Sequence, residues 1–194
     1  RPSLNKYALV DAISLMLKQE PLADWLIKQS PHLVGRTIYY IASECWNVGG
    51  GLGYVGQYHV SAMKQLLDDR AKLVTIEPRY PYRLNANGEL ETVNYRELPI
   101  PVEDLPESPN FEYEVHVKGK PVTAQVFRGK NKLGIEAYLI EDKDDYYTKM
   151  LYRYGQYGTA RWDEFSEFFS LAALELMHKI EYKNMDELGR DWKA

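Results

Sequence analysis

The chain has 194 residues, of which 45% are hydrophobic and 27% charged, and its formal net charge is −4. These values are ordinary for one folded globular domain and exclude a disordered chain, a collagen and a coiled coil. Without a basic excess no nucleic-acid partner is expected, and no apolar run approaches the roughly 18 residues of a membrane span. The single cysteine, Cys45, excludes an internal disulfide and is typical of a reducing compartment, which predicts a cytoplasmic location.

Residues 1–34 are expected to form a separate N-terminal helical segment. Apolar residues at helical spacing predict a helix over 4–17, which Pro21 ends, and residues 22–29 are typical of a second, short helix. The remaining residues, 35–194, are predicted to form part of a Rossmann-like domain.

A strand, a glycine-rich loop, a helix and a second strand open that domain. Residues 37–42 are a continuous β-prone run, suited to a strand buried on both faces. Five glycines follow between 49 and 56, and an amphipathic stretch over 54–68 predicts a helix. Residues 73–76 predict a second buried strand. This βαβ unit implies two neighbouring parallel strands joined by a right-handed crossover.

The second half of the chain changes to alternating hydrophobicity, which is typical of antiparallel strands. The predicted strands cover 111–117, 122–127 and 133–140, with turns at 118–120 and 129–132. A short helix is expected over 144–151 and a long amphipathic helix over 162–180. The predicted fold class is therefore α/β: a Rossmann-like parallel sheet flanked by helices, with an antiparallel β-meander insertion.

The glycine-rich loop is the best candidate for a functional site. Bare N–H groups at a helix N-terminus can approach a phosphate or a sugar closely, and the helix dipole favours negative charge there. Four glycines in five residues cost about 1 kcal/mol each to order relative to alanine, which favours a functional role. The predicted substrate-binding residues are Gly49, Gly50, Gly51, Leu52 and Gly53. Residues that could line the same site are Glu44, Asn47, Tyr54 and His59.

The loop also contains a literal G-x-G-x-x-G over 51–56, the fingerprint of dinucleotide binding. Glu77 follows about 20 residues later, where a ribose-binding acid would lie. Residues 43–48 separate the strand from the first glycine, however, whereas in that motif the glycine follows the strand at once. An NAD(P)-binding oxidoreductase is therefore a lesser alternative, and a P-loop is excluded because no Gly-Lys-Ser/Thr follows.

Three segments together resemble a known family. They are Ile41-Ala42-Ser43-Glu44 followed by Gly50-Gly51-Leu52-Gly53-Tyr54-Val55, then Gly134-Ile135-Glu136-Ala137-Tyr138-Leu139-Ile140, then Phe168-Phe169-Ser170-Leu171-Ala172-Ala173-Leu174-Glu175. In this order they are similar to bacterial glycogen and starch synthases, retaining glycosyltransferases of the two-Rossmann-domain GT-B type. The resemblance covers residues 37–180 and implies the N-terminal, acceptor-side half of a GT-B fold.

That resemblance implies a function and its partners. The full-length protein would extend an α-1,4-glucan acceptor from a nucleotide-glucose donor, without a cofactor or a metal, using a C-terminal domain that is missing from these residues. The lysine that synthases carry before the glycines is absent from Asn47-Val48-Gly49, and Tyr54 replaces their usual aspartate. We therefore expect this chain to be inactive by itself.

Two alternatives stay open within the same fold type. The α-glucan phosphorylases resemble the chain as well, because a histidine follows their glycine loop at the spacing of His59. A non-catalytic glucan-binding or interaction domain would keep the fold and dispense with the lysine.

Other residues are assigned structural roles. Asp142-Lys143-Asp144 matches a D-x-D metal signature, but an acidic turn after a strand is the favoured interpretation. The four histidines share no ligand spacing, so no metal site is predicted. Cys45 is interpreted as a buried apolar residue and not as a nucleophile. The aromatic loop with Tyr152, Tyr154 and Tyr157 either stacks on glucan or is a simple ordered loop.

Overall fold

The computed structural model of the chain describes residues 31–46, 51–67, 69–84, 87, 89–98, 100–144, 146–148, 150–151 and 160–186. The helices predicted over 4–17 and 22–29 lie outside these residues. The described elements are η1 (Pro31–Leu33), β1 (Thr37–Ile41), α3 (Gly51–Leu67), β2 (Lys72–Pro78), β3 (Tyr82–Leu84), β4 (Leu90–Thr92), β5 (Val102–Glu103), β6 (Phe111–Val117), β7 (Lys120–Asn131), β8 (Glu136–Asp142), β9 (Met150–Leu151) and α4 (Ala160–Asp186).

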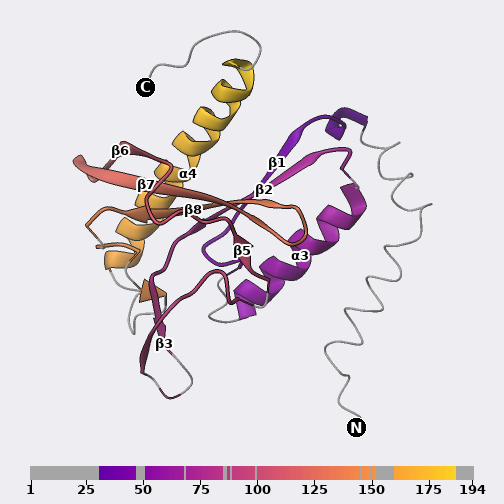
Figure 1. Cartoon of the computed structure of the whole chain (residues 1–194). Helices are drawn as coiled ribbons and strands as arrows, with labels where there is room; N and C mark the ends of the chain where they lie inside the picture. Colours follow the sequence, from indigo (N-terminus) through magenta and orange to yellow (C-terminus); the bar gives the residue numbers. More distant parts are fainter. Residues whose placement is uncertain are drawn as a thin grey trace.

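A six-stranded mixed sheet forms the centre of the molecule (Figure 1). Its order is β1-β2-β8-β7-β5, and β6 also pairs with β7. The strands β1, β2 and β8 are parallel, with Ile38 opposite Leu73 and Ile76 opposite Tyr138. The long strand β7 runs antiparallel to both β6 and β8. The predicted parallel pair and the predicted antiparallel meander are both confirmed.

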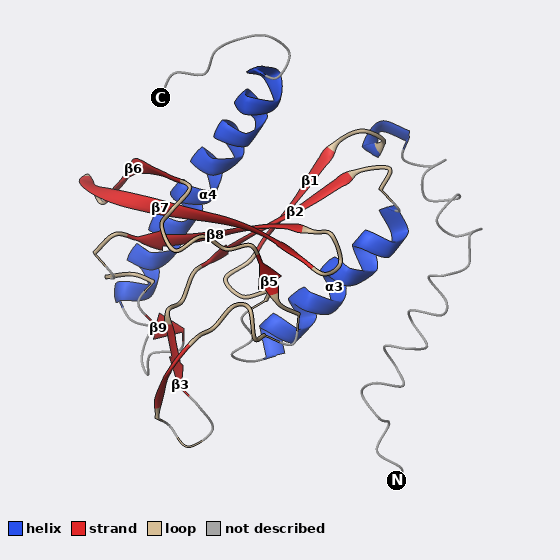
Figure 2. Cartoon of the chain, in the orientation of Figure 1, coloured by secondary structure: helices blue, strands red, loops and turns tan. Residues whose placement is uncertain are grey.

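The two long helices cover opposite faces of this sheet, which gives a three-layer α/β/α arrangement (Figure 2). Side chains alternate between the faces of a strand. In β2, Val74 faces the core under α4 and Leu73 faces the core under α3. Phe168 of α4 and Val60 of α3 are fully buried in these two cores. No helix in the described part of the chain is long and apolar enough to cross a membrane.

The position of β1 differs from the prediction of a strand buried on both faces. Among the described strands β1 pairs only with β2, so it lies at an edge of the sheet. Its residues are half-buried, and Ile41 is 42% exposed. An apolar β-prone run indicates that a strand forms, but the order of strands depends on long-range pairing that the run does not encode.

The short helix predicted over 144–151 is wrong. Residues 146–148 form bends, and Met150–Leu151 is the strand β9, which pairs with β3. The physical reason is the buried carboxylate of Asp142, which accepts the N–H groups of Tyr146, Tyr147 and Thr148. Such local side-chain bonds compete with helical ones.

The turn predicted over 129–132 is also displaced, because β7 continues to Asn131. Gly129 lies within the strand at a position where β5 comes very close. A β-carbon there would lie 2.7 Å from the carbonyl oxygen of Glu103 and 2.7 Å from Val102 Cγ1. This glycine therefore serves a close approach of two strands and not a turn.

Candidate functional site

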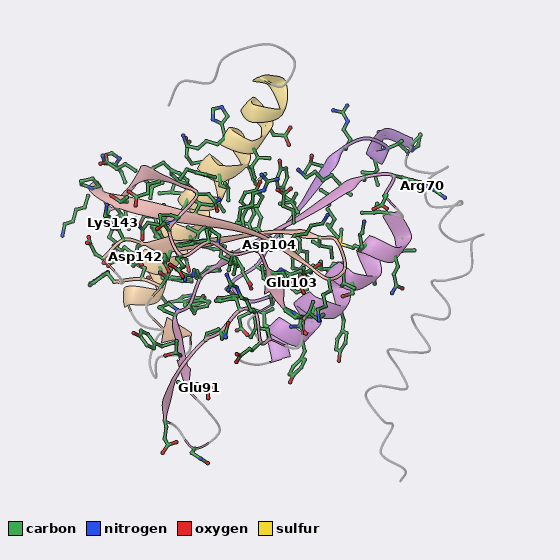
Figure 3. The ribbon with its side chains drawn as sticks, in the orientation of Figure 1. Arg70, Glu91, Glu103, Asp104, Asp142 and Lys143 are labelled. Carbon is green, nitrogen blue, oxygen red and sulfur yellow. The ribbon has the colours of Figure 1, made fainter. Side chains whose placement is uncertain are left out.

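The ends of the parallel strands and the start of α3 meet at one edge of the sheet. The strands β1, β2 and β8 end at Ile41, Pro78 and Asp142, and α3 begins beside them at Gly51. Arg70 and Asp142 mark the amino edge and the carboxyl edge in Figure 3. In open α/β sheets, ligands bind outside the carboxyl ends of the strands. Gly51 and Gly53, at the start of α3, therefore lie at the edge where such a site is expected.

Glu77 fixes the loop that follows β1. Its side chain is only 1% exposed, and its Oε2 accepts hydrogen bonds from the backbone N–H of Cys45 at 2.6 Å and of Trp46 at 3.0 Å. Bonds from amides to a carboxylate are roughly twice as strong as neutral ones. Glu77 is thus a buried anchor of the loop. This role weighs against the lesser alternative, in which Glu77 would bind the ribose of a dinucleotide.

Trp46 ties the same loop to two neighbouring elements. Its indole N–H donates to Thr75 Oγ1 at 2.8 Å, and its carbonyl accepts from Gln57 Nε2 at 3.1 Å. A third tie comes from Tyr80, whose hydroxyl donates to the carbonyl of Ser43 at 3.1 Å. Trp46, Thr75, Gln57 and Tyr80 are all buried. The loop 42–46 is therefore held against β2 and α3.

The helix α3 begins at Gly51, three residues before the predicted start. The N–H groups of its first turn have no partner within the helix and carry the positive end of its dipole. Leu52 and Tyr54 are 49% and 54% exposed, whereas Gly53 is buried. The structure thus places Gly51, Leu52 and Gly53 together at an N-terminus suited to an anion.

Gly56 explains why the helix lies so close to the loop. A β-carbon at this position would lie 3.0 Å from the carbonyl oxygen of Glu44 and 3.4 Å from Cys45 Cα. The last glycine of the G-x-G-x-x-G pattern therefore permits tight packing of α3 on the loop 42–46.

The remaining predicted site residues are placed differently. Asn47, Gly49 and Gly50 lie outside the described residues. Glu44 is fully buried, and its role in lining the site stays a prediction. His59 lies on the exposed side of α3, where its ring meets Tyr40 edge-on at 5.5 Å. Eight residues at about 1.5 Å each put it roughly 12 Å along the helix from Gly51.

The interpretation of Cys45 as a buried apolar residue fits its surroundings. The side chain is 1% exposed. Burial, together with the nearby Glu77, raises the pKa of the Cys45 thiol well above its usual range. The protonated thiol is not a nucleophile.

Asp142 organises the loop after β8. Its Oδ2 accepts the N–H of Tyr146 at 2.6 Å, and its Oδ1 accepts those of Tyr147 at 3.0 Å and Thr148 at 2.9 Å. This is the acidic turn that the sequence favoured for the D-x-D motif. Within the described ranges, no three or more His, Cys, Asp or Glu side chains are grouped so that they could hold a metal. The aromatic loop with Tyr152, Tyr154 and Tyr157 lies outside those ranges.

One pair at this edge was missed by sequence reasoning. Arg79, directly after β2, donates from one Nη to both carboxylate oxygens of Glu141 at 2.9 Å, and its guanidinium lies 3.9 Å from the ring centre of Phe127. The only sequence signal was a basic residue after a buried strand. The partner became visible only through the parallel pairing of β2 with β8.

Comparison with known proteins gives two matches. Residues 37–194 match the family model described as starch synthase catalytic domain. Among solved structures, the catalytic domain of starch synthase IV from Arabidopsis thaliana, bound to ADP and acarbose, is similar with a TM-score of 0.53 and 21% identity. That match covers 76% of this chain and 26% of the other, so this chain spans about a quarter of its length. Comparison with curated proteins finds no match.

Proposed function

The chain belongs to the family of starch synthase catalytic domains, and from this premise we propose that it is the N-terminal, acceptor-side part of a retaining glucosyltransferase. Its substrates are a nucleotide-glucose donor and an α-1,4-glucan acceptor. In this proposal, the Rossmann-like domain begins near residue 35. A second Rossmann-like domain, outside these residues, supplies the other wall of the donor site.

One observation carries the proposal. The helix α3 starts at Gly51 at the carboxyl edge of the parallel strands, and it packs closely on the loop 42–46, which Glu77 and Trp46 hold in place. Orphan N–H groups on a fixed support can stabilise charge without reorganising during the reaction. The diphosphate of a nucleotide sugar is the anion that fits this arrangement.

The proposed reaction develops negative charge where these N–H groups lie. The bond between C1 of glucose and the phosphate oxygen breaks, and the nucleoside diphosphate leaves with the electron pair. A new bond forms between C1 and the 4-hydroxyl oxygen of the glucan on the same face of the sugar, and the hydroxyl proton is released. The N–H groups of Gly51, Leu52 and Gly53 stabilise the leaving diphosphate.

Two observations bear on the alternatives. The lysine expected before the glycines is absent, which keeps a non-catalytic glucan-binding domain as the second candidate. The buried anchoring role of Glu77 weighs against an oxidoreductase. The single cysteine supports a cytoplasmic location as part of the proposal.

Glucosyl transfer to maltooligosaccharides, measured with ADP-glucose and with UDP-glucose, tests the proposal. We expect transfer, with α-1,4 bonds seen by NMR, from the protein that carries both domains. We expect none from these 194 residues alone, because water exclusion and phosphate neutralisation need both walls. Transfer by the isolated chain would contradict the two-domain requirement. Glucan binding without transfer by the two-domain protein would establish the non-catalytic candidate.

A further inference from the structure

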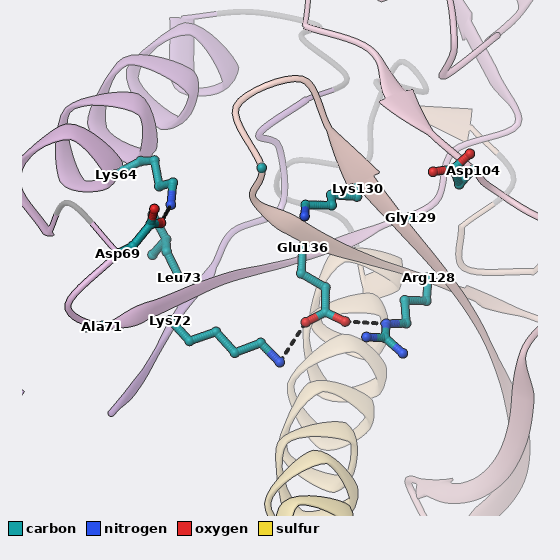
Figure 4. Close-up of a pocket in the computed structure, with 11 residues that line it drawn as sticks. Lys64, Asp69, Ala71, Lys72, Leu73, Asp104, Arg128, Gly129, Lys130 and Glu136 are labelled. Carbon is teal, nitrogen blue, oxygen red and sulfur yellow. Dashed lines mark hydrogen bonds and ion pairs between the residues drawn. The ribbon is translucent and has the colours of Figure 1, made fainter. Parts of the chain in front are cut away.

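A hollow lies at the edge of the sheet opposite the glycines, where β2 and β8 begin. It is a cavity of about 600 Å³. The residues that line it come from the end of α3 and the loop after it, the start of β2, the end of β7 and the turn after it, and the start of β8, and Asp104 follows β5 (Figure 4). The length of β2, seven residues at about 3.3 Å each, separates it by roughly 20 Å from the edge with the glycines. It is therefore distinct from the candidate donor site.

Positive charge is concentrated around one carboxylate in this cavity. Glu136 pairs with Lys72, at 2.7 Å, and with the Nε of Arg128. Lys130 lies directly across from Glu136 in the pairing of β7 with β8 and also lines the cavity (Figure 4). Two cations thus share one carboxylate, and Lys130 adds a third cation to the lining. Burial opposes ionisation of Glu136, but Lys72, Arg128 and Tyr138 together hold its pKa below the usual range.

Donors remain available on these cations. Glu136 engages only the Nε of Arg128, and among the described residues the two Nη groups make no hydrogen bond. Lys130 forms no ion pair within the same ranges. Planar guanidinium groups bind phosphate oxygens through two parallel bonds, and a lysine adds a point charge. This part of the cavity is therefore arranged for a phosphate.

Acidic and apolar residues complete the lining. Asp69, which pairs with Lys64, and Asp104 supply carboxylate oxygens, and buried Ala71 and Leu73 supply apolar surface. A paired carboxylate keeps further lone pairs, which can accept from hydroxyl groups. The volume lies within the 300–1,000 Å³ range of small-molecule sites and exceeds what a bare phosphate would fill.

We propose that this cavity binds a phosphorylated sugar, with its phosphate on Lys72, Arg128 and Lys130 and its hydroxyl groups toward Asp69 and Asp104. The inference goes beyond the proposed function and does not rest on it, because the cavity takes its ligand at the far edge of the sheet.

Titration of the 194-residue chain with glucose 6-phosphate, followed by calorimetry and by amide NMR, tests this proposal. We expect saturable binding that shifts the amides of Gly129 and Gly134 and leaves that of Gly53 unchanged. Glucose without phosphate should not bind, and inorganic phosphate should bind more weakly. Shifts centred on Gly53 instead would assign the ligand to the donor site and overturn the inference, as would the absence of saturable binding.

Matched lysine variants make the test specific. Lys130→Gln removes a cation from the cavity, whereas Lys132→Gln removes another exposed lysine, from the adjoining turn, that does not line it. We expect Lys130→Gln and Arg128→Gln to raise the Kd for glucose 6-phosphate at least about fivefold, and Lys132→Gln to leave it unchanged. If Lys130→Gln and Lys132→Gln weaken the binding of glucose 6-phosphate equally, the attraction is non-specific and the proposal is overturned. If inorganic phosphate binds as tightly as glucose 6-phosphate, the sugar makes no contribution and that part of the proposal is wrong.

Discussion

Glu77 shows how one side chain shapes the candidate site without facing it. Its carboxylate lies in the core and accepts two backbone N–H groups of the loop 42–46. An acid at the end of a parallel strand is commonly read as a ligand contact. Here the acid holds the loop, and the loop places the start of α3.

The exchange Glu77→Gln should loosen this loop. It keeps the size of the side chain but removes the charge, so two charge-assisted bonds become weaker. We expect a loss of about 1–3 kcal/mol in the free energy of unfolding, measured by urea denaturation at pH 7. The thiol of Cys45, 1% exposed, should also react faster with a disulfide reagent.

The exposed Glu107 provides the control for this variant. Glu107→Gln makes the same chemical change at a site without buried hydrogen bonds. Its free energy of unfolding should lie within about 0.5 kcal/mol of the wild-type value. Equal stabilities of the two variants would show that Glu77 is not an anchor.

The helix α3 uses its glycines for two separate purposes. Gly51 lies at its first position, where the proposed ligand would approach the N–H groups of the first turn. Gly56 lies one and a half turns later, where a β-carbon would approach the carbonyl of Glu44 at 3.0 Å. One glycine thus serves the proposed ligand and the other serves packing.

Two substitutions separate these roles. In the two-domain protein, Gly51→Ala should lower kcat/KM for transfer at least about tenfold, or about 1.4 kcal/mol, with an unchanged melting temperature. Gly56→Val should overpack the contact with the loop 42–46 at a cost of about 1–3 kcal/mol and lower the melting temperature by several degrees. If Gly51→Ala instead loses stability and keeps normal turnover, the first glycines form only a tight turn and the proposed contact with the ligand is wrong.

Across the whole molecule, burial is unequal between the parallel strands. Every residue of β8 is buried, and the strand pairs on both sides, with β2 and β7. In contrast, β1 is half-buried at the edge. Amide exchange followed by NMR should therefore be at least about tenfold slower in β8 than in β1, because edge bonds open locally without exposing the core. Equal protection of the two strands would contradict the edge position of β1.

The sequence by itself determined the elements and their class. Continuous β-prone runs, a glycine cluster and a 3.6-residue period are local signals, so β1, β2, α3, the meander and α4 were predicted with the correct parallel and antiparallel pairing. The order of the segments also carried the resemblance that the family match at residues 37–194 confirms. Hydrophobic periodicity reports which face of an element is buried, and this requires no knowledge of its neighbours.

Only the tertiary structure decided what each polar residue does and where each strand lies. Glu77 became an anchor because the ends of β1 and β2 meet, and Asp142 prevented a helix because its carboxylate is buried among three amides. The cations around Glu136 gather from β2 and β7, more than 50 residues apart in the chain. Such contacts depend on strand order and register. The free energy of the whole fold sets both, so a local sequence pattern does not predict them.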